Sequence, residues 1–176
     1  MADSRRKARA AKEQAISPEA VQAAVDYDPE TGNFTRRYGG VRRSADGLVG
    51  WIDANGYRVL TICGTRVMAH RIAWVCIHGR WPAWHIDHVN GDKGDNRIAN
   101  LREANHSQNM QNQGKNSRNT SGLKGAYWDK SRGKWLSLIG SGGKYRHLGR
   151  FDTAEEAHDA YCRAAAEMHG EFANLG

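Results

Sequence analysis

The sequence predicts an α+β protein built from two small units. Its 176 residues are only 39% hydrophobic and include 20 glycines, which suits one or two small cores better than a single large one. Short strand-like runs bounded by glycine turns occur in both halves, together with segments of helical spacing. Residues 113–122 contain no apolar side chain and therefore predict a linker between the units.

The N-terminal region begins with a basic segment. Residues 1–15 are expected to form an arm that becomes ordered on a partner, because they carry Arg5, Arg6, Lys7, Arg9 and Lys12. A terminus without a role is the alternative. The run Ser17-Pro18-Glu19 then has the N-cap and first-turn proline of a short helix, which should continue through Val25 toward Asp26.

Three short β segments are expected before the next helix. Residues 34–37, 47–52 and 56–63 have strand-like composition, and Asn55-Gly56 is a suitable hairpin corner, so we expect one small antiparallel sheet. Residues 68–78 show the apolar spacing of a mostly buried helix, which Gly79 is placed to end.

The region after the linker predicts a three-stranded sheet covered by one helix. Residues 124–130, 134–139 and 144–151 form three strand-like runs joined by glycine-containing turns. The run Thr153-Ala-Glu-Glu156 is a capping box that starts a helix. The apolar stripe of this helix consists of Ala157, Ala160, Tyr161, Ala164 and Met168.

Charge is distributed unevenly along the chain, whose formal net charge is +7. Residues 113–151 carry nine Lys or Arg against the single acid Asp129, whereas six acids and one Arg follow from Asp152 onward. A basic block of this kind predicts a surface that binds a polyanion.

Other features of the composition bear on the compartment. The cysteines Cys63, Cys76 and Cys162 form no CxxC pair and are expected to be buried, reduced thiols. No apolar run approaches the roughly 20 residues of a membrane span. We therefore expect a cytoplasmic protein without membrane contact.

Histidine, aspartate and asparagine are concentrated in residues 85–102, with Asn109 following. Phosphodiester hydrolysis needs an activated water, neutralisation of the phosphate charge and stabilisation of the leaving oxygen, which one imidazole and one divalent metal can supply. Hard cations such as Mg²⁺ or Mn²⁺ prefer oxygen ligands. Asp87 and Asn109 are therefore the candidate metal ligands.

The order Asp87-His88-Val-Asn-Gly91, Asn96-Arg-Ile-Ala-Asn100-Leu-Arg102 and Asn109 resembles the HNH endonucleases of the phage and intron-encoded type. The resemblance covers roughly residues 68–112 and implies a small ββα-metal nuclease domain. It implies that His88 is the general base, that Asp87 and Asn109 hold the metal, and that Asn100 fixes the His-bearing loop by hydrogen bonds to backbone.

Several neighbouring residues have alternative interpretations. His70 is expected in the core, with a place near the catalytic centre as the alternative. His85 shares a strand face with Asp87, and His106 could cap the following helix, so both are expected to be phosphate or surface residues. Asp92, Asp95 and Asn96 are expected to form turns and not to bind metal.

The C-terminal region resembles the plant ethylene-response-factor type of DNA-binding domain. The resemblance rests on residues 119–176 and above all on Leu148-Gly-Arg-Phe-Asp-Thr-Ala-Glu-Glu-Ala157. It implies duplex DNA as the partner, bound through the sheet. The residues expected to contact DNA are Lys124, Tyr127, Lys130, Arg132, Trp135 and Arg146.

This chain departs from the ethylene-response-factor pattern where Lys124, Tyr127 and Asp129 stand near positions usually held by Arg, so no target sequence carries over. For Trp128 and Trp135, a role in packing the sheet onto the helix and a role in DNA contact are equal alternatives. Because side chains alternate along a strand, only one of Tyr127 and Trp128 can face the helix.

Together these features predict a metal-dependent DNA endonuclease of phage or mobile-element type that homes or nicks. The expected parts are a basic arm (1–15), a nuclease domain (16–112), a linker (113–122) and a sheet-type DNA-binding domain (123–176). Linking two modest DNA contacts raises their joint affinity. The alternatives are a non-catalytic DNA-binding regulator with a degenerate nuclease motif and an RNA-binding accessory protein. The target sequence, the choice between nicking and double-strand cleavage, the oligomeric state, the protein partners and any DNA contact of the arm stay open.

Overall fold

A computed structural model describes residues 11–37, 48–116 and 119–176 of the chain. The first ten residues of the predicted basic arm lie outside the described residues, as do residues 38–47. The chain forms two compact units, Met1–Glu103 and Ala104–Gly176. Both contain helices and antiparallel strands, which confirms the predicted α+β class.

Besides the helical residues 11–14, the described part of the first unit contains two further helices, a 3₁₀ turn and seven short strands. In chain order these are α2 (Pro18–Ala24), β1 (Val25–Tyr27), β2 (Phe34–Arg36), β3 (Trp51–Ile52), β4 (Arg58–Ile62), β5 (Thr65–Met68), α3 (Ala69–His78), β6 (His85–His88), η1 (Ile98–Asn100) and β7 (Leu101–Ala104). The strands form the antiparallel pair β1-β2, the three-stranded sheet β3-β4-β5 and the pair β6-β7.

The pairing of the early strands differs from the prediction of one sheet. The segment Phe34–Arg36 pairs with Val25–Tyr27, and Thr65–Met68 completes the other sheet instead. The helix was expected to run past Val25, but it ends at Ala24 because Val25 adopts an extended backbone and is buried in the β1-β2 pair. A branched side chain favours that extended conformation.

One apolar core joins α2, α3 and the sheets of the first unit. Phe34, Leu60 and Ile72 are almost completely buried in it, and α3 ends at Gly79 in the left-handed conformation, as predicted. The buried Glu13 pairs with Arg71 of α3 at 2.8 Å, so this part of the predicted arm is anchored on the unit. Cys63 is exposed and not buried as expected, because it lies in the tight turn between β4 and β5 with φ of 47°.

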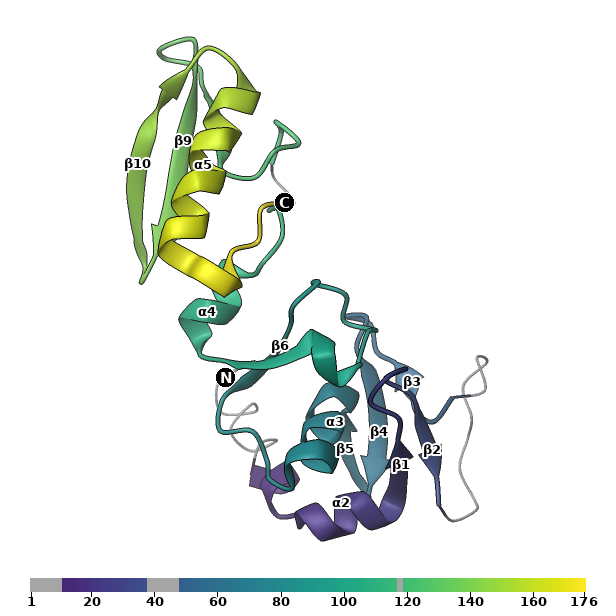
Figure 1. Ribbon diagram of the computed structural model, residues 1–176. Coiled ribbons are helices and arrows are strands. Elements are labelled where there is room, and N and C mark those ends of the chain that lie inside the picture. The colour runs from purple at the N-terminus through teal and green to yellow at the C-terminus, as the bar shows by residue number, and fades with distance from the viewer. Residues whose placement is uncertain (1–10, 38–47, 117–118) are drawn as a thin grey trace. The chain divides into compact units, whose positions relative to one another are not determined.

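The second unit contains a three-stranded sheet with one long helix on one face, as predicted. Its elements are α4 (His106–Gln111), β8 (Ala126–Asp129), β9 (Lys134–Ser141), β10 (Lys144–Phe151), α5 (Ala154–His169) and η2 (Gly170–Phe172). The strand order is β10-β9-β8, and α5 lies along the sheet (Figure 1). Thr153 and Glu156 form the predicted capping box, and Ile139 packs against Tyr161 and Ala165.

Residues 111–113, the last of which was expected to begin a free linker, are held by hydrogen bonds within the second unit. The Lys124 ammonium donates to the carbonyl oxygens of Gln111 (3.4 Å), Gln113 (2.5 Å) and Asn174 (2.9 Å). The Asn174 amide donates to Asn112 O at 2.9 Å. The two compact units divide between Glu103 and Ala104, before α4, and the expected domain boundary at Asn112 stays a prediction.

No helix in the described parts of the chain is long and apolar enough to cross a membrane.

Gly125 is a position where the second unit tolerates no side chain. Its φ is +79°, and a Cβ there would lie 2.2 Å from the Tyr161 ring. Gly122 has nearly the same φ of +75° but has nothing within 4 Å of the same point. We expect Gly125→Ala to lower the free energy of unfolding of the second unit by more than about 3 kcal/mol, because overpacking adds to backbone strain.

Gly122→Ala is the matched control and should cost only the backbone strain of about 1–2 kcal/mol. Denaturant titration followed by helical circular dichroism measures both variants. Equal loss of stability in the two variants would contradict the close packing of Tyr161 on Gly125.

Candidate functional site

The predicted catalytic pair Asp87-His88 lies at the end of β6, which is paired with β7. Both residues are buried, at 6% and 5% exposure. Arg102 of β7 approaches the Asp87 carboxylate with two nitrogens, Nε at 3.0 Å and Nη2 at 2.9 Å from Oδ2. The β6-β7 pair therefore holds the carboxylate in a fixed orientation beside the partly buried Arg102 cation.

The His88 imidazole contacts two further polar residues. Its Nε2 lies 3.5 Å from Asn96 Oδ1, and its ring meets the His70 ring edge to face at 5.1 Å. Burial lowers the pKa of His88, against the opposing effects of the Asn96 hydrogen bond and the Asp87 charge. The imidazole is therefore held neutral near pH 7, the form that accepts a proton.

Asn96 determines which His88 nitrogen carries the proton. Asn96 is buried and its Nδ2 donates to Gly94 O at 3.0 Å, which turns Oδ1 toward the imidazole. An amide oxygen only accepts hydrogen bonds, so this contact favours the tautomer that carries its proton on Nε2.

Asn100 makes hydrogen bonds across the loop that follows His88. Its Oδ1 accepts from Asn90 N at 3.0 Å and its Nδ2 donates to Asp95 O at 2.9 Å, while Val89 N donates to Asn100 O at 2.9 Å. These are backbone contacts of the kind expected for Asn100. Its part in catalysis stays a prediction.

The acidic residues of this loop form turns and ion pairs within it. Asp92 Oδ1 accepts from Gly94 N at 2.8 Å, and Asp95 accepts from Arg97 Nε at 2.8 Å and from Asn90 Nδ2 at 2.9 Å. The Arg97 hydrogen bond lowers the pKa of Asp95 to about 2. Asp95 is therefore ionised at neutral pH and stabilises the loop through these hydrogen bonds.

His70 of α3 satisfies both interpretations offered for it. It is buried, as expected for a core histidine, and its ring also adjoins that of His88. The centroid of the Tyr57 ring lies 5.5 Å from that of His70 and 6.1 Å from that of His88, so these three rings form one cluster. Burial raises the pKa of Tyr57, which keeps its hydroxyl protonated.

The second predicted metal ligand, Asn109, lies on α4 in the other compact unit. Asn105 and Gln108 cap this helix reciprocally, and His106, which was considered as a cap, is instead its first residue. Among the described residues, no three His, Cys, Asp or Glu side chains gather as a metal site. A carboxylate and a carboxamide are nevertheless the oxygen donors that suit a hard cation.

The strand register of the second unit separates two faces of its sheet. Trp128 pairs with Trp135, and alternation places both on the face of the buried Ser137 and Ile139, which α5 covers. The two indole rings meet at 5.2 Å. Tyr127 lies on the opposite face; its exposed fraction of 44% is close to the 45% of Trp128, so the register and not the exposure separates the two.

Three of the six residues predicted to contact DNA make contacts within the second unit. Lys124 gives its ammonium to three carbonyl oxygens, which match its three N–H donors. The placement of Trp135 favours the packing interpretation, and Arg146 Nη1 lies 4.0 Å from Met168 Sδ of α5. Contact of these three residues with DNA stays a prediction.

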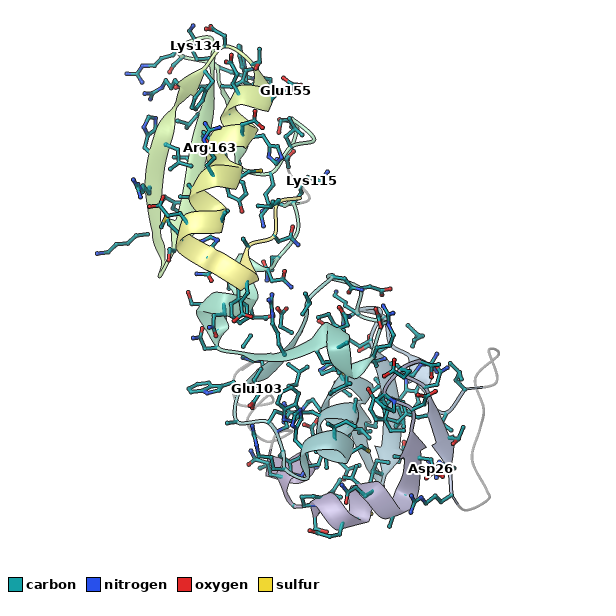
Figure 2. All side chains as sticks on the ribbon, in the orientation of Figure 1. Asp26, Glu103, Lys115, Lys134, Glu155 and Arg163 are labelled. Atoms are coloured by element: carbon teal, nitrogen blue, oxygen red, sulfur yellow. The ribbon has the colours of Figure 1, made fainter. Side chains whose placement is uncertain are left out.

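The other predicted contacts lie on or beside the open face of the sheet. Lys130 and Arg132 are exposed in the β8-β9 turn, and Tyr127 precedes them on β8. Arg150 of β10 donates to Asp129 at 3.2 Å, and Lys134 pairs with Asp152 at the end of the unit where Figure 2 shows Lys134 and Glu155. The basic side chains thus gather around the β8-β9 turn, with two of them oriented by carboxylates.

Three residues of these sites were not predicted to have a role in them. Arg102 belongs to the quoted motif, but its contact with Asp87 follows from the pairing of β6 with β7, which was not predicted. Asn96 was interpreted as a turn former, although it also contacts His88. Tyr145 is 80% exposed and by register lies on the same sheet face as Tyr127.

The chain is similar to known proteins in both units. Residues 67–111 match the family model of an HNH endonuclease, and residues 121–171 match that of the AP2 domain. Protein 3.8 of Escherichia phage T7 is 34% identical to this chain over 107 residues, which are 60% of this chain and 88% of the phage protein. No solved structure matches the chain with significance.

These matches agree with the two resemblances stated from the sequence, in the same order along the chain. The chain therefore belongs to the family of phage T7 protein 3.8 and joins an HNH endonuclease domain to an AP2 DNA-binding domain.

Proposed function

We propose that this protein is an active, metal-dependent endonuclease that hydrolyses phosphodiester bonds in duplex DNA inside a phage-infected cell. The observation that carries the proposal is the buried Asp87-His88 pair, with Arg102 on the carboxylate, Asn96 on the imidazole and Asn100 across the loop. A surface loop without function has no physical reason to bury a carboxylate and an imidazole side by side.

In this proposal His88 is the general base. With Nε2 protonated toward Asn96, the Nδ1 lone pair takes the proton of the attacking water. The depressed pKa keeps the imidazole neutral and ready to accept that proton. Asn96 and Asn100 act as positioning residues, because Asn96 contacts His88 and Asn100 binds the backbone of the loop that follows it.

HNH nucleases generally use a divalent metal, and we propose Mg²⁺ or Mn²⁺ held by Asp87 and Asn109. The bound ion supplies neutralisation of the phosphate and of the leaving 3′ oxygen. Arg102 orients Asp87 by binding Oδ2 with two nitrogens. We propose that homing or nicking of DNA is the setting of this reaction.

The AP2 domain is proposed to hold the duplex against the open face of its sheet. Tyr127, Lys130 and Arg132 are the contacts best supported by their exposure, with Arg150 beside them. Lys124 and Trp135 are proposed to support this surface from within the unit, whereas the exposed Arg146 remains a proposed DNA contact. Phosphate contacts position such a domain on DNA, whereas base contacts determine its sequence preference.

Replacing His88 tests the catalytic proposal. We expect His88→Ala to slow nicking of supercoiled plasmid in Mg²⁺ by about 10²–10⁴-fold, the usual contribution of a general base, while DNA affinity is kept. His78→Ala is the matched control, since His78 is an exposed histidine at the end of α3. Chelation of the metal should stop cleavage by the wild-type protein.

Cleavage by His88→Ala at the wild-type rate would refute the role of His88. Absence of cleavage by the wild-type protein in Mg²⁺ and Mn²⁺, with DNA binding retained, would identify a non-catalytic DNA-binding regulator instead. Tighter binding to RNA than to duplex DNA would favour the RNA-binding alternative.

The basic turn of the AP2 domain generates a separate prediction. We expect Lys130→Ala/Arg132→Ala to weaken duplex binding and to reduce the slope of log affinity against log salt by up to about 2, because each phosphate contact contributes about 0.9 to that slope. Arg163→Ala is the control, since Arg163 is exposed on α5 (Figure 2). Fluorescence anisotropy at several salt concentrations measures both. An unchanged slope in the double variant would remove this turn from the DNA contact.

A further inference from the structure

A hollow of about 490 Å³ lies at one end of the AP2 sheet, within the second unit. It exists because the strands differ in length. The β9-β10 pairing continues to Ser141 and Lys144, whereas β8 begins only at Ala126, opposite Ser137. The space that a longer β8 would fill is bounded instead by α4 residues, including Met110 and Gln111.

One wall of the hollow is an exposed aromatic platform. Tyr145 is 80% exposed, although tyrosine ordinarily buries much of its ring. Its ring lies across Gly140 of the neighbouring strand, where a Cβ would stand 3.3 Å from the ring edge. The absence of a side chain at Gly140 thus lets the ring lie against the sheet while its other side is presented to solvent.

The charge of the hollow suits an anionic ligand. Two lysines, Lys124 and Lys144, line it, and none of the lining residues, all of them in the described part of the chain, is Asp or Glu. Lys124 is committed to carbonyl oxygens inside the unit. Lys144 is exposed and lines the same hollow as Tyr145, so the hollow contains a cation as well as an aromatic ring.

The hollow is also continuous with the proposed DNA surface, because Tyr127 and Leu138 of the open sheet face line it. A volume of about 490 Å³ lies within the range of roughly 300–1,000 Å³ found for small-molecule sites. A paired base inside a duplex is already stacked on both sides, whereas an unpaired base has a free face for an aromatic ring.

We propose that this hollow binds an unpaired nucleobase of DNA, stacked on Tyr145, with the adjoining phosphate on Lys144. The inference rests on the proposed binding of DNA by the AP2 domain and adds to it a preference for DNA that contains an unpaired nucleotide. The occupant is defined by its chemistry, a flat aromatic base joined to a phosphate.

Anisotropy titration of the full chain tests the proposal, with metal chelated so that cleavage plays no part. The two probes are a labelled duplex with one unpaired adenine and the same duplex without it. We expect the wild-type protein to bind the first probe at least about fivefold more tightly, since stacking of one base on an aromatic ring is worth at least that factor.

Two substitutions at Tyr145 distinguish the effect of losing the aromatic ring from a general loss of structure. Tyr145→Phe keeps the ring and should keep the preference, whereas Tyr145→Ala should reduce the ratio of the two affinities to about one. Lys144→Ala should lower the affinity for the probe with the unpaired adenine more than that for the intact duplex.

An equal affinity of the wild-type protein for the two probes would overturn the inference while leaving the nuclease proposal standing. The same holds if Tyr145→Ala keeps the preference, or if Tyr145→Ala disrupts self-association measured without DNA, which would assign the hollow to a second copy of the chain. Failure to bind either probe would overturn DNA binding itself, and with it both proposals.

Discussion

The proposed catalytic geometry depends on the side-chain amide of Asn100. It is buried, and it ties Asn90 N to Asp95 O across the loop that follows His88. Opening the loop would leave the amide of the buried Asn100 without these partners, and an unsatisfied buried polar group costs about 1–3 kcal/mol. The loop therefore stays closed, Asn96 stays beside the imidazole, and His88 stays packed on His70. A rigid imidazole with one defined lone pair is the condition for general-base catalysis at this position.

A second constraint shapes the DNA-binding unit. The Lys124 ammonium joins the end of α4 to the C-terminal segment, and Asn174 adds a hydrogen bond to Asn112 O. The expected linker consequently contributes to the packing of the second unit, and α4, which carries Asn109, is counted in that unit. Burial lowers the pKa of Lys124, yet the three carbonyl acceptors satisfy its charge. A residue expected to touch phosphate thus has a structural explanation of its own.

Sequence patterns predicted most where local chemistry decides the structure. The capping box at Thr153, the left-handed Gly79 and the three strands of the AP2 sheet follow from residues within a few positions of one another. The pairing of Val25–Tyr27 with Phe34–Arg36 was missed because a helical pattern and a strand compete at Val25 and tertiary burial decides. The contacts of Arg102 with Asp87 and of Asn96 with His88 join residues from different elements, which spacing alone cannot show.

The single-turnover rate of DNA cleavage by Asn100→Ala at saturating enzyme tests the central claim most directly, because DNA affinity and product release do not enter that rate. Loss of the two backbone hydrogen bonds should displace His88 and slow cleavage by about 100-fold, the usual effect of a misplacement near 1 Å, while the metal concentration needed for half-maximal rate stays within a few-fold. Cleavage at the wild-type rate by a folded Asn100→Ala protein would contradict the account.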